Sequence, residues 1–150
     1  LITVGIEKNI PIFIDPKGPN WGKYSHATCL TPNKKEVEEQ LDLNLKSDTD
    51  FENAARVLIE KFKLKYCVIT RGAEGMTFSS KDRIIHQAVG KKEVYDVSGA
   101  GDTVISCLAA SRSSGATIDD SIKVSSEISS KVVAYNGTVP FNIKMFELNE

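Results

Sequence analysis

The stretch from Val94 to Val104 constrains the fold of this chain most, because its local pattern changes twice within a few residues. Residues 93–95 form a charged, β-branched and aromatic run that predicts the end of a strand. Residues 98–101 read Ser-Gly-Ala-Gly, which is typical of a tight turn. From Asp102 onward, apolar residues at helical spacing predict a helix. The sequence therefore predicts a strand, a glycine turn and a helix start in direct succession.

The glycine turn also indicates a chemistry. The first N–H groups of a helix have no partner within it and lie at the positive end of its dipole. Glycines at 99 and 101, with Ala100 between them, let an anion approach these amides, so the turn is a candidate oxyanion or phosphate cradle. Asp102 adds a carboxylate that can accept a proton from an attacking hydroxyl. The alternative is a capped helix in which Asp102 only complements the dipole, and the turn alone does not decide between the two.

Two common glycine motifs do not fit this turn. A Walker loop needs a Lys-Ser/Thr pair after its second glycine, and none follows Gly101. A dinucleotide fingerprint needs a third glycine at the position that Val104 occupies. Neither of these nucleotide sites is therefore predicted.

Residues 96–103 closely resemble the second signature of the ribokinase-like, phosphofructokinase B type sugar kinases, which reads Asp-Thr/Ser-x-Gly-Ala-Gly-Asp. The resemblance implies that Asp102 is the catalytic base and that Gly99, Ala100 and Gly101 form the anion hole.

Further segments are similar to the heptose-7-phosphate kinase branch of this family and occur in the family's order, namely residues 15–18, 30–36, 69–76 and 94–96. The resemblance covers roughly residues 11 to 140 and corresponds to the C-terminal half of these kinases. It implies that most sugar-contacting residues belong to the other half, so we expect this chain to be a fragment.

Residues 10–15 form a short apolar run that ends in Asp15, the pattern of a buried parallel strand. Asp15 then lies at a carboxyl end of the sheet, where open α/β folds place their ligands. A turn at Pro16 and Gly18 leaves Lys17 free to point at a phosphate. The resemblance makes Asp15 and Lys17 candidate substrate-binding residues; the alternative is a surface lysine in a β-turn.

Residues 27–30 predict the next strand, and Thr31 with Pro32 predicts a helix start with the Thr31 hydroxyl as its cap. Asn33 and Glu36 then allow two interpretations. With Asn33 as the cap, Glu36 completes an ordinary capping box. In the other interpretation they match the Asn-x-x-Glu motif of the resembled family, which implies a role near Mg²⁺, bound water and the triphosphate.

Apolar residues from Phe51 to Phe62 recur at helical spacing and predict an amphipathic helix, capped by Asp48 or Asp50. Residues 66–70 predict a buried strand, 71–75 a turn, and 76–78 and 84–86 further strands. By resemblance, the nucleotide-binding Thr-x-Gly-x-x-Gly segment supplies four candidates: Thr70, Arg71, Gly72 and Gly75. Arg71 can neutralise phosphate charge, or it is simply a solvated arginine in a turn.

Gly115 predicts the end of the helix that begins at Asp102, and Thr117 with Asp120 predicts the cap of another. The resemblance implies that the end of this second helix borders the adenine, with Val132, Asn136 and Gly137 as candidates. It also implies a monovalent cation such as K⁺ near Asp96 and Ser98.

His26 and His86 have no His, Cys or acid at ligand spacing, so we expect structural roles for both.

Composition excludes several classes of function. The chain has 19 Lys+Arg and 20 Asp+Glu among its 150 residues, which argues against nucleic acid or an anionic membrane as a partner. Its length suits one domain with a sizeable core. Three cysteines without Cys-x-x-Cys spacing predict reduced core thiols, and with no secretory signal we expect a cytoplasmic protein.

Taken together, the patterns predict an α/β protein with a mostly parallel sheet flanked by helices. We expect a single partial carbohydrate-kinase domain over residues 1–150, with open sheet edges that favour self-association. The resemblance implies phosphorylation of D-glycero-β-D-manno-heptose 7-phosphate at its C1 hydroxyl by ATP with Mg²⁺, in ADP-heptose synthesis for lipopolysaccharide. The alternatives are another sugar or nucleoside kinase of the family, and a catalytically silent nucleotide-binding or assembly module.

Overall fold

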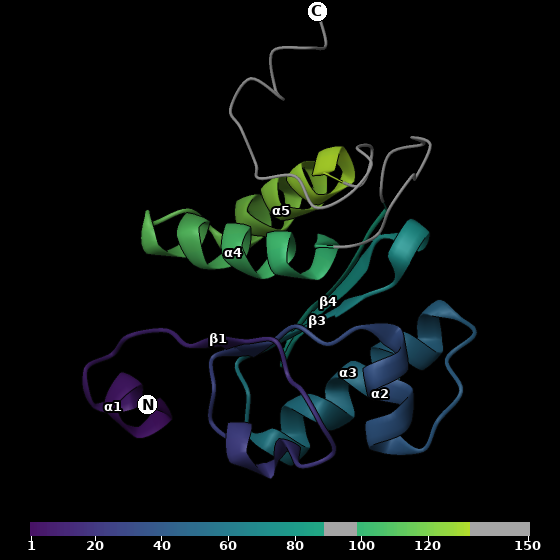
Figure 1. Ribbon diagram of the computed structural model, residues 1–150, viewed down its shortest axis with the longest axis horizontal. Coiled ribbons are helices and arrows are strands. Elements are labelled where there is room, and N and C mark those ends of the chain that lie inside the picture. Colours follow the sequence, from purple (N-terminus) through teal and green to yellow (C-terminus); the bar gives the residue numbers. More distant parts are fainter. Residues whose placement is uncertain (89–98, 133–150) are drawn as a thin grey trace, which may run out of the picture. The chain divides into compact units, whose positions relative to one another are not determined.

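The computed structural model describes residues 1–88 and 99–132 of the chain (Figure 1). The chain divides into two compact units, Leu1–Gln87 and Ala88–Glu150, and each is described by itself. The strand predicted at 93–95 lies outside the described residues.

The first unit is built on one five-stranded sheet with the order β1-β2-β3-β4-β5. β1, β2 and β3 are parallel, whereas β4 and β5 each run antiparallel to the preceding strand. The α/β class is therefore confirmed, but parallel and antiparallel neighbours are equal in number among the described strands. The antiparallel part follows from the short turns before β4 and β5, which leave no room for a crossover. The strands are β1 (Phe13–Ile14), β2 (Cys29–Leu30), β3 (Tyr66–Thr70), β4 (Met76–Ser80) and β5 (Ile84–Gln87).

Helices of the first unit connect and cover these strands. They are α1 (Ile2–Glu7), η1 (Trp21–Tyr24), α2 (Lys34–Leu41), α3 (Asp48–Phe62) and η2 (Gly72–Glu74). α3 packs against β3 and β4, and α2 contacts β3 (Figure 1). The short helix α1 is not indicated by any pattern in the sequence, since its residues form no amphipathic stripe long enough to detect.

α3 forms where the apolar spacing predicts it. Its apolar face is buried, comprising Phe51, Ala54, Ala55, Leu58 and Phe62. The predicted cap at Asp48 or Asp50 is wrong, because Ser47 caps the helix. The Ser47 hydroxyl accepts a hydrogen bond from the Asp50 N–H, and the Asp50 carboxylate accepts one from the Ser47 N–H at 2.8 Å. Asp50 therefore closes a capping box from the third helical position.

The core of the first unit joins α3 to the loop after β1. The Trp21 ring lies 6.1 Å from the Phe62 ring and is 2% exposed, and its Nε1 donates to the Gly18 carbonyl at 2.9 Å. Full burial of one such apolar side chain stabilises a fold by about 1.5–3 kcal/mol. Trp21 therefore anchors the loop that carries Lys17.

The second unit, in its described part, consists of α4 (Ala100–Ser113) and α5 (Ile118–Val132), which pack against each other (Figure 1). α4 begins two residues before the predicted start at Asp102. Gly115, with φ of +88°, separates the helices as predicted. The Asp120 N–H donates to the Thr117 hydroxyl at 3.2 Å, which confirms Thr117 as the predicted cap.

Among the described residues, no helix is both long enough and apolar enough to span a bilayer. All three cysteines are free thiols; Cys29 and Cys67 are buried in adjacent strands and Cys107 is half-buried in α4.

Candidate functional site

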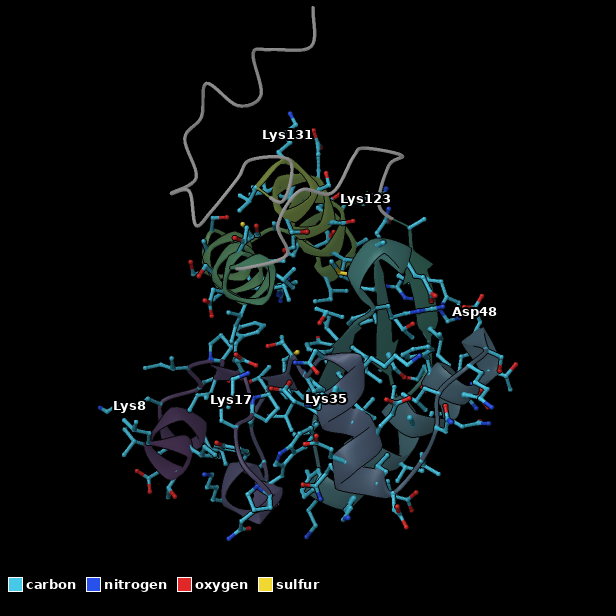
Figure 2. All side chains as sticks on the ribbon, turned by 45° about the vertical axis from the view of Figure 1, so that its right-hand side comes forward. Lys8, Lys17, Lys35, Asp48, Lys123 and Lys131 are labelled. Carbon is cyan, nitrogen blue, oxygen red and sulfur yellow. The ribbon has the colours of Figure 1, made fainter. Side chains whose placement is uncertain are left out.

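Three predicted site residues from two separate segments meet beside the sheet. Asp15 and Lys17 follow β1, and Glu36 lies in the first turn of α2. The Lys17 Nζ lies 2.6 Å from Glu36 Oε1 and 3.0 Å from Asp15 Oδ2. Figure 2 labels Lys17, with Lys35 marking the neighbouring helix α2. The structure thus brings the predicted substrate and metal candidates into one charged cluster.

Asn33 and Glu36 form a complete capping box. The Glu36 N–H donates to Asn33 Oδ1 at 2.9 Å, and the Asn33 N–H donates to Glu36 Oε2 at 2.8 Å. The prediction of Thr31 as the cap is wrong: Thr31 is buried, and its hydroxyl donates to the Ile14 carbonyl. Asn33 has the extended backbone that a cap requires and an amide oxygen to receive the orphan N–H.

Lys17 is held at its backbone, and its ammonium is paired with Glu36 and Asp15 while remaining exposed to solvent. The Tyr24 hydroxyl accepts from the Lys17 N–H and donates to the Lys17 carbonyl, both at 3.3 Å. The hydrogen bond to Glu36 raises the pKa of Lys17; partial burial opposes this, and Asp15 adds to it. The side chain is 64% exposed, so the ammonium can reach a ligand in solvent.

The donor chemistry of this cluster fits a hard cation. Carboxylate and amide oxygens are what Mg²⁺ prefers, and the Glu36 carboxylate already faces a positive charge. Within the described ranges, no group of three or more His, Cys, Asp or Glu side chains could hold a metal by itself. A single carboxylate agrees with the habit of Mg²⁺ of taking its other ligands from water and phosphate.

A cavity of about 200 Å³ lies beside Glu36. Its lining consists of Gly18, Pro19, Trp21, Glu36, Glu39 and Gln40. The Gln40 Oε1 is buried and has no hydrogen-bond partner among the described residues. Sequence reasoning missed Glu39 and Gln40, although their spacing of three and four from Glu36 places them on the same helix face.

Asn33 also lies beside the predicted nucleotide segment at the end of β3. Asn33 and Thr70 form an isolated parallel bridge, and the Thr70 N–H donates to the Pro32 carbonyl at 2.9 Å. The turn after Thr70 contains two glycines with positive φ, Gly72 at +61° and Gly75 at +94°. Residues far apart in sequence that match the resembled family therefore lie together at the carboxyl edge of the parallel strands.

Arg71, in the same turn, is paired within the protein. Its guanidinium lies 2.6 Å from Asp48 Oδ1 and 2.8 Å from Glu74 Oε2, and its Cζ lies 4.2 Å from the Phe51 ring centroid. The side chain is 9% exposed, so a merely solvated arginine is excluded. Burial lowers the pKa of Arg71, but the hydrogen bonds to Glu74 and Asp48 outweigh it and raise this pKa. These contacts favour a role in holding the turn.

His86 lies next to this turn and has an acidic partner that the sequence did not indicate. Its Nε2 lies 3.0 Å from Glu52 Oε1, and its Nδ1 lies 3.0 Å from the Thr77 hydroxyl. Glu52 comes from α3, so sequence spacing does not reveal it.

The glycine turn of the second unit begins α4. Gly99 is the N-cap with φ of +80°, a left-handed conformation that favours glycine, and no side chain caps the helix. Gly101 lies in the first turn, and an added Cβ there would meet no described atom within 4 Å. Asp102 is exposed at the third helical position. The described fold therefore requires glycine at 99 but not at 101.

The remaining candidates lie at or beyond the limits of the described residues. Val132 is the buried last residue of α5. Asp96, Ser98, Asn136 and Gly137 lie outside the described residues.

Comparisons with known proteins assign the chain to a family. Residues 2–144 match the pfkB family carbohydrate kinases. The chain is 44% identical over 139 residues to the bifunctional protein HldE of Vibrio vulnificus (strain YJ016), covering 92% of this chain and 29% of that protein. It is 38% identical over 147 residues to the bifunctional protein HldE of Campylobacter concisus, covering 98% of this chain and 31% of that protein. The chain thus spans less than a third of these relatives.

Solved structures show the same fold. Phosphofructokinase-2 from Escherichia coli in complex with substrates and products has a TM-score of 0.84 at 18% identity, over 97% of this chain and 48% of that one. Arabidopsis thaliana ribokinase complexed with ribose and ATP has a TM-score of 0.81 at 19% identity, over 91% and 46%. The ribokinase-like fold is therefore confirmed, and the chain belongs to the pfkB family of carbohydrate kinases.

Proposed function

We propose that this chain is the nucleotide-binding and catalytic part of an ATP-dependent sugar kinase. The observation that carries the proposal is the meeting of three family-matching segments at one edge of the sheet. Lys17 contacts Glu36, and the neighbouring Asn33 is bridged to Thr70, although these residues come from three separate segments of the chain. Membership of a carbohydrate kinase family and ATP bound in a structural neighbour support a phosphotransferase.

The proposed substrate is D-glycero-β-D-manno-heptose 7-phosphate, phosphorylated at its C1 hydroxyl in ADP-heptose synthesis for lipopolysaccharide. This choice rests on the similarity of residues 15–18, 30–36 and 69–76 to the heptose kinase branch. The alternative substrate class is another sugar, such as ribose or fructose, or a nucleoside. A catalytically silent nucleotide-binding module is the second alternative, because the chain spans only part of its relatives.

In the proposed reaction, Asp102 accepts the proton of the C1 hydroxyl of the sugar. At the same time the oxygen of that hydroxyl bonds to the γ-phosphorus of ATP. The bond between that phosphorus and the bridging oxygen breaks, and ADP leaves. The amides of Gly99, Ala100 and Gly101 stabilise charge on the transferred group. Most of the catalysis is then positioning and charge stabilisation.

The other residues bind and orient. Glu36 and Asn33 would hold Mg²⁺ through bound water, and the ion would neutralise charge on the phosphates. Asp15 and Lys17 contact the sugar phosphate or the transferred group. The nucleotide candidates remain Thr70, Arg71, Gly72, Gly75, Val132, Asn136 and Gly137, and the monovalent cation candidates remain Asp96 and Ser98. For Arg71 the internal ion pairs limit any such role to shaping the turn.

We further propose that residues 1–150 form a single partial domain in a cytoplasmic protein. Buried free thiols at Cys29 and Cys67 support a reducing compartment. β1 lies at one end of the strand order, so its edge can pair with further chain or with a second copy.

The proposed function is tested by calorimetric titration of the chain with MgATP, with and without heptose 7-phosphate, beside a coupled assay for ADP release. We expect MgATP binding by the wild type. Glu36→Gln should weaken MgATP binding, because it removes the carboxylate charge. Glutamine can still form the capping box, so the fold is kept. Absence of MgATP binding would overturn the nucleotide site, and a substrate panel in which another sugar gives the higher kcat/KM would overturn the heptose assignment.

A further inference from the structure

Both oxygens of the Glu36 carboxylate have a partner in the structure. Its Oε2 accepts from the Asn33 N–H at 2.8 Å, and its Oε1 lies 2.6 Å from the Lys17 ammonium. Lys17 therefore lies where a cation bound through Oε1 would lie. Two cations cannot share this oxygen without mutual repulsion, so a metal ion and the ammonium compete for it.

The loop holds Lys17 in place for this contact. Tyr24 binds both backbone polar groups of Lys17, and Trp21, itself buried, binds the carbonyl of the next residue. The backbone is thus fixed while the side chain stays 64% exposed. An ion pair with this exposure is weak and exchanges readily.

Asp15 gives the ammonium a second partner. Its Oδ2 lies 3.0 Å from the Lys17 Nζ, on the side of β1 rather than of α2. Lys17 can therefore leave Glu36 and still keep a carboxylate, which lowers the cost of the exchange.

We propose that Lys17 is an internal counter-cation of Glu36, which occupies the carboxylate without nucleotide and releases it when a divalent cation binds. The inference rests on the proposed function, because it takes Glu36 as the carboxylate that holds the metal. On release, Lys17 stays with Asp15 and presents its ammonium to a phosphate of the substrate. Lys17 in this way couples metal entry to phosphate binding.

The proposal predicts the direction of an effect on metal affinity. Lys17→Met removes the cation that competes for the Glu36 carboxylate. It should therefore tighten Mn²⁺ binding about 1.4- to fivefold, the range that corresponds to an exposed ion pair. If Lys17 only oriented Glu36, the opposite would be expected. Its loss would then leave the carboxylate less well ordered and weaken Mn²⁺ binding.

The test is titration of the 150-residue chain with Mn²⁺ in the absence of nucleotide, with free Mn²⁺ followed by electron paramagnetic resonance. Lys23→Met is the matched control, since Lys23 is an exposed lysine of η1, within the same connection between β1 and β2, and its loss changes the net charge equally. We expect tightening in Lys17→Met beyond that in Lys23→Met. The gain should disappear when Lys17→Met is combined with Glu36→Gln.

Unchanged or weaker Mn²⁺ binding in Lys17→Met overturns the inference, as does a gain that persists without the Glu36 carboxylate. So does the absence of measurable Mn²⁺ binding in both the wild type and Lys17→Met. Circular dichroism identifies any variant that fails to fold, and Lys17→Gln then replaces Lys17→Met. Because no nucleotide is present, the Mn²⁺ titration is measured separately from the MgATP titration, and a failure of this inference can be distinguished from a failure of the proposed function.

Discussion

The guanidinium of Arg71 and the carboxylate of Asp48 form an ion pair with 2.6 Å between Nη1 and Oδ1, 23 positions apart in the sequence. The pair joins the first turn of α3, where Asp48 is labelled in Figure 2, to the turn after β3. Glu74, the Phe51 ring, the Thr77 hydroxyl and His86 also contact the guanidinium. The candidate nucleotide turn is therefore fixed from the side of α3.

Arg71→Met should lower the free energy of unfolding by about 1–2 kcal/mol, because hydrogen bonds to charged groups and a ring contact are lost together. The loss stays below that of a fully buried pair, since Asp48 and Glu74 are exposed and regain water. Urea unfolding measures it. Arg56→Met, an exposed arginine of the same α3, should change stability by less than about 0.5 kcal/mol, and equal effects in both variants would contradict this role of Arg71.

Acid should weaken the same region. The hydrogen bond from Arg71 lowers the pKa of Asp48 below 3.8, and backbone hydrogen bonds from Lys46 and Ser47 lower that of Asp50. A folded-state pKa below the unfolded value gives stability that is present above about 3.8 and is lost as the pH falls through the folded pKa. Urea unfolding between pH of about 6 and about 3 measures the free energy of unfolding of the wild type and of Asp48→Asn. The difference between the two proteins should become smaller as the pH falls. A difference in the free energy of unfolding that stays constant over this pH range would contradict the prediction.

The two thiols in β2 and β3 should be inert in the folded chain. Burial raises the pKa of Cys67 to about 12 and that of Cys29 well above its usual range, so neither forms the reactive thiolate near neutral pH. We expect a disulfide reagent to modify Cys29 and Cys67 only at the rate of unfolding, with mass spectrometry counting the adducts. Cys107→Ser removes the half-buried third thiol and isolates this pair. Rapid labelling of Cys107→Ser in native buffer would show that the strands are open.

The periodic parts of the fold could be predicted from the sequence. α3 and β3 were expected where they occur, because a helical stripe from Phe51 to Phe62 and an apolar run at 66–70 depend only on local pattern and burial. The same holds for Thr117, whose cap is decided within four residues. The Asn33 capping box was one of two interpretations and is present as well.

Contacts between distant segments could not be predicted. Lys17 and Glu36 are 19 positions apart, and their pairing depends on how β1 and β2 align as neighbours. Arg71 was expected to be solvated or to face phosphate, since no local pattern reveals Asp48 as its partner. The Ser47 cap was missed because two aspartates nearby are equally good caps by residue type.

Gly101→Ala separates the needs of the fold from those of a ligand. Gly101 is helical, and an added Cβ meets no described atom within 4 Å, so alanine should stabilise α4 by up to about 1 kcal/mol. If an anion approaches the amides there, the same methyl group should weaken MgATP binding at least about tenfold, which corresponds to about 1.4 kcal/mol. Thermal unfolding and calorimetry measure the two effects. Unchanged affinity in a stabilised variant would remove Gly101 from the anion hole.

Asp102→Asn should lower kcat at least about 100-fold, because asparagine cannot accept the proton of the sugar hydroxyl. The measurement uses a form of the protein that phosphorylates the sugar. MgATP binding should be retained, since the substitution removes a negative charge near the phosphates. Asp120→Asn is the matched control: Asp120 holds the same third position of α5 and closes the cap with Thr117. It should lower stability without lowering kcat. Similar turnover in both variants would mean that Asp102 only complements the dipole of α4.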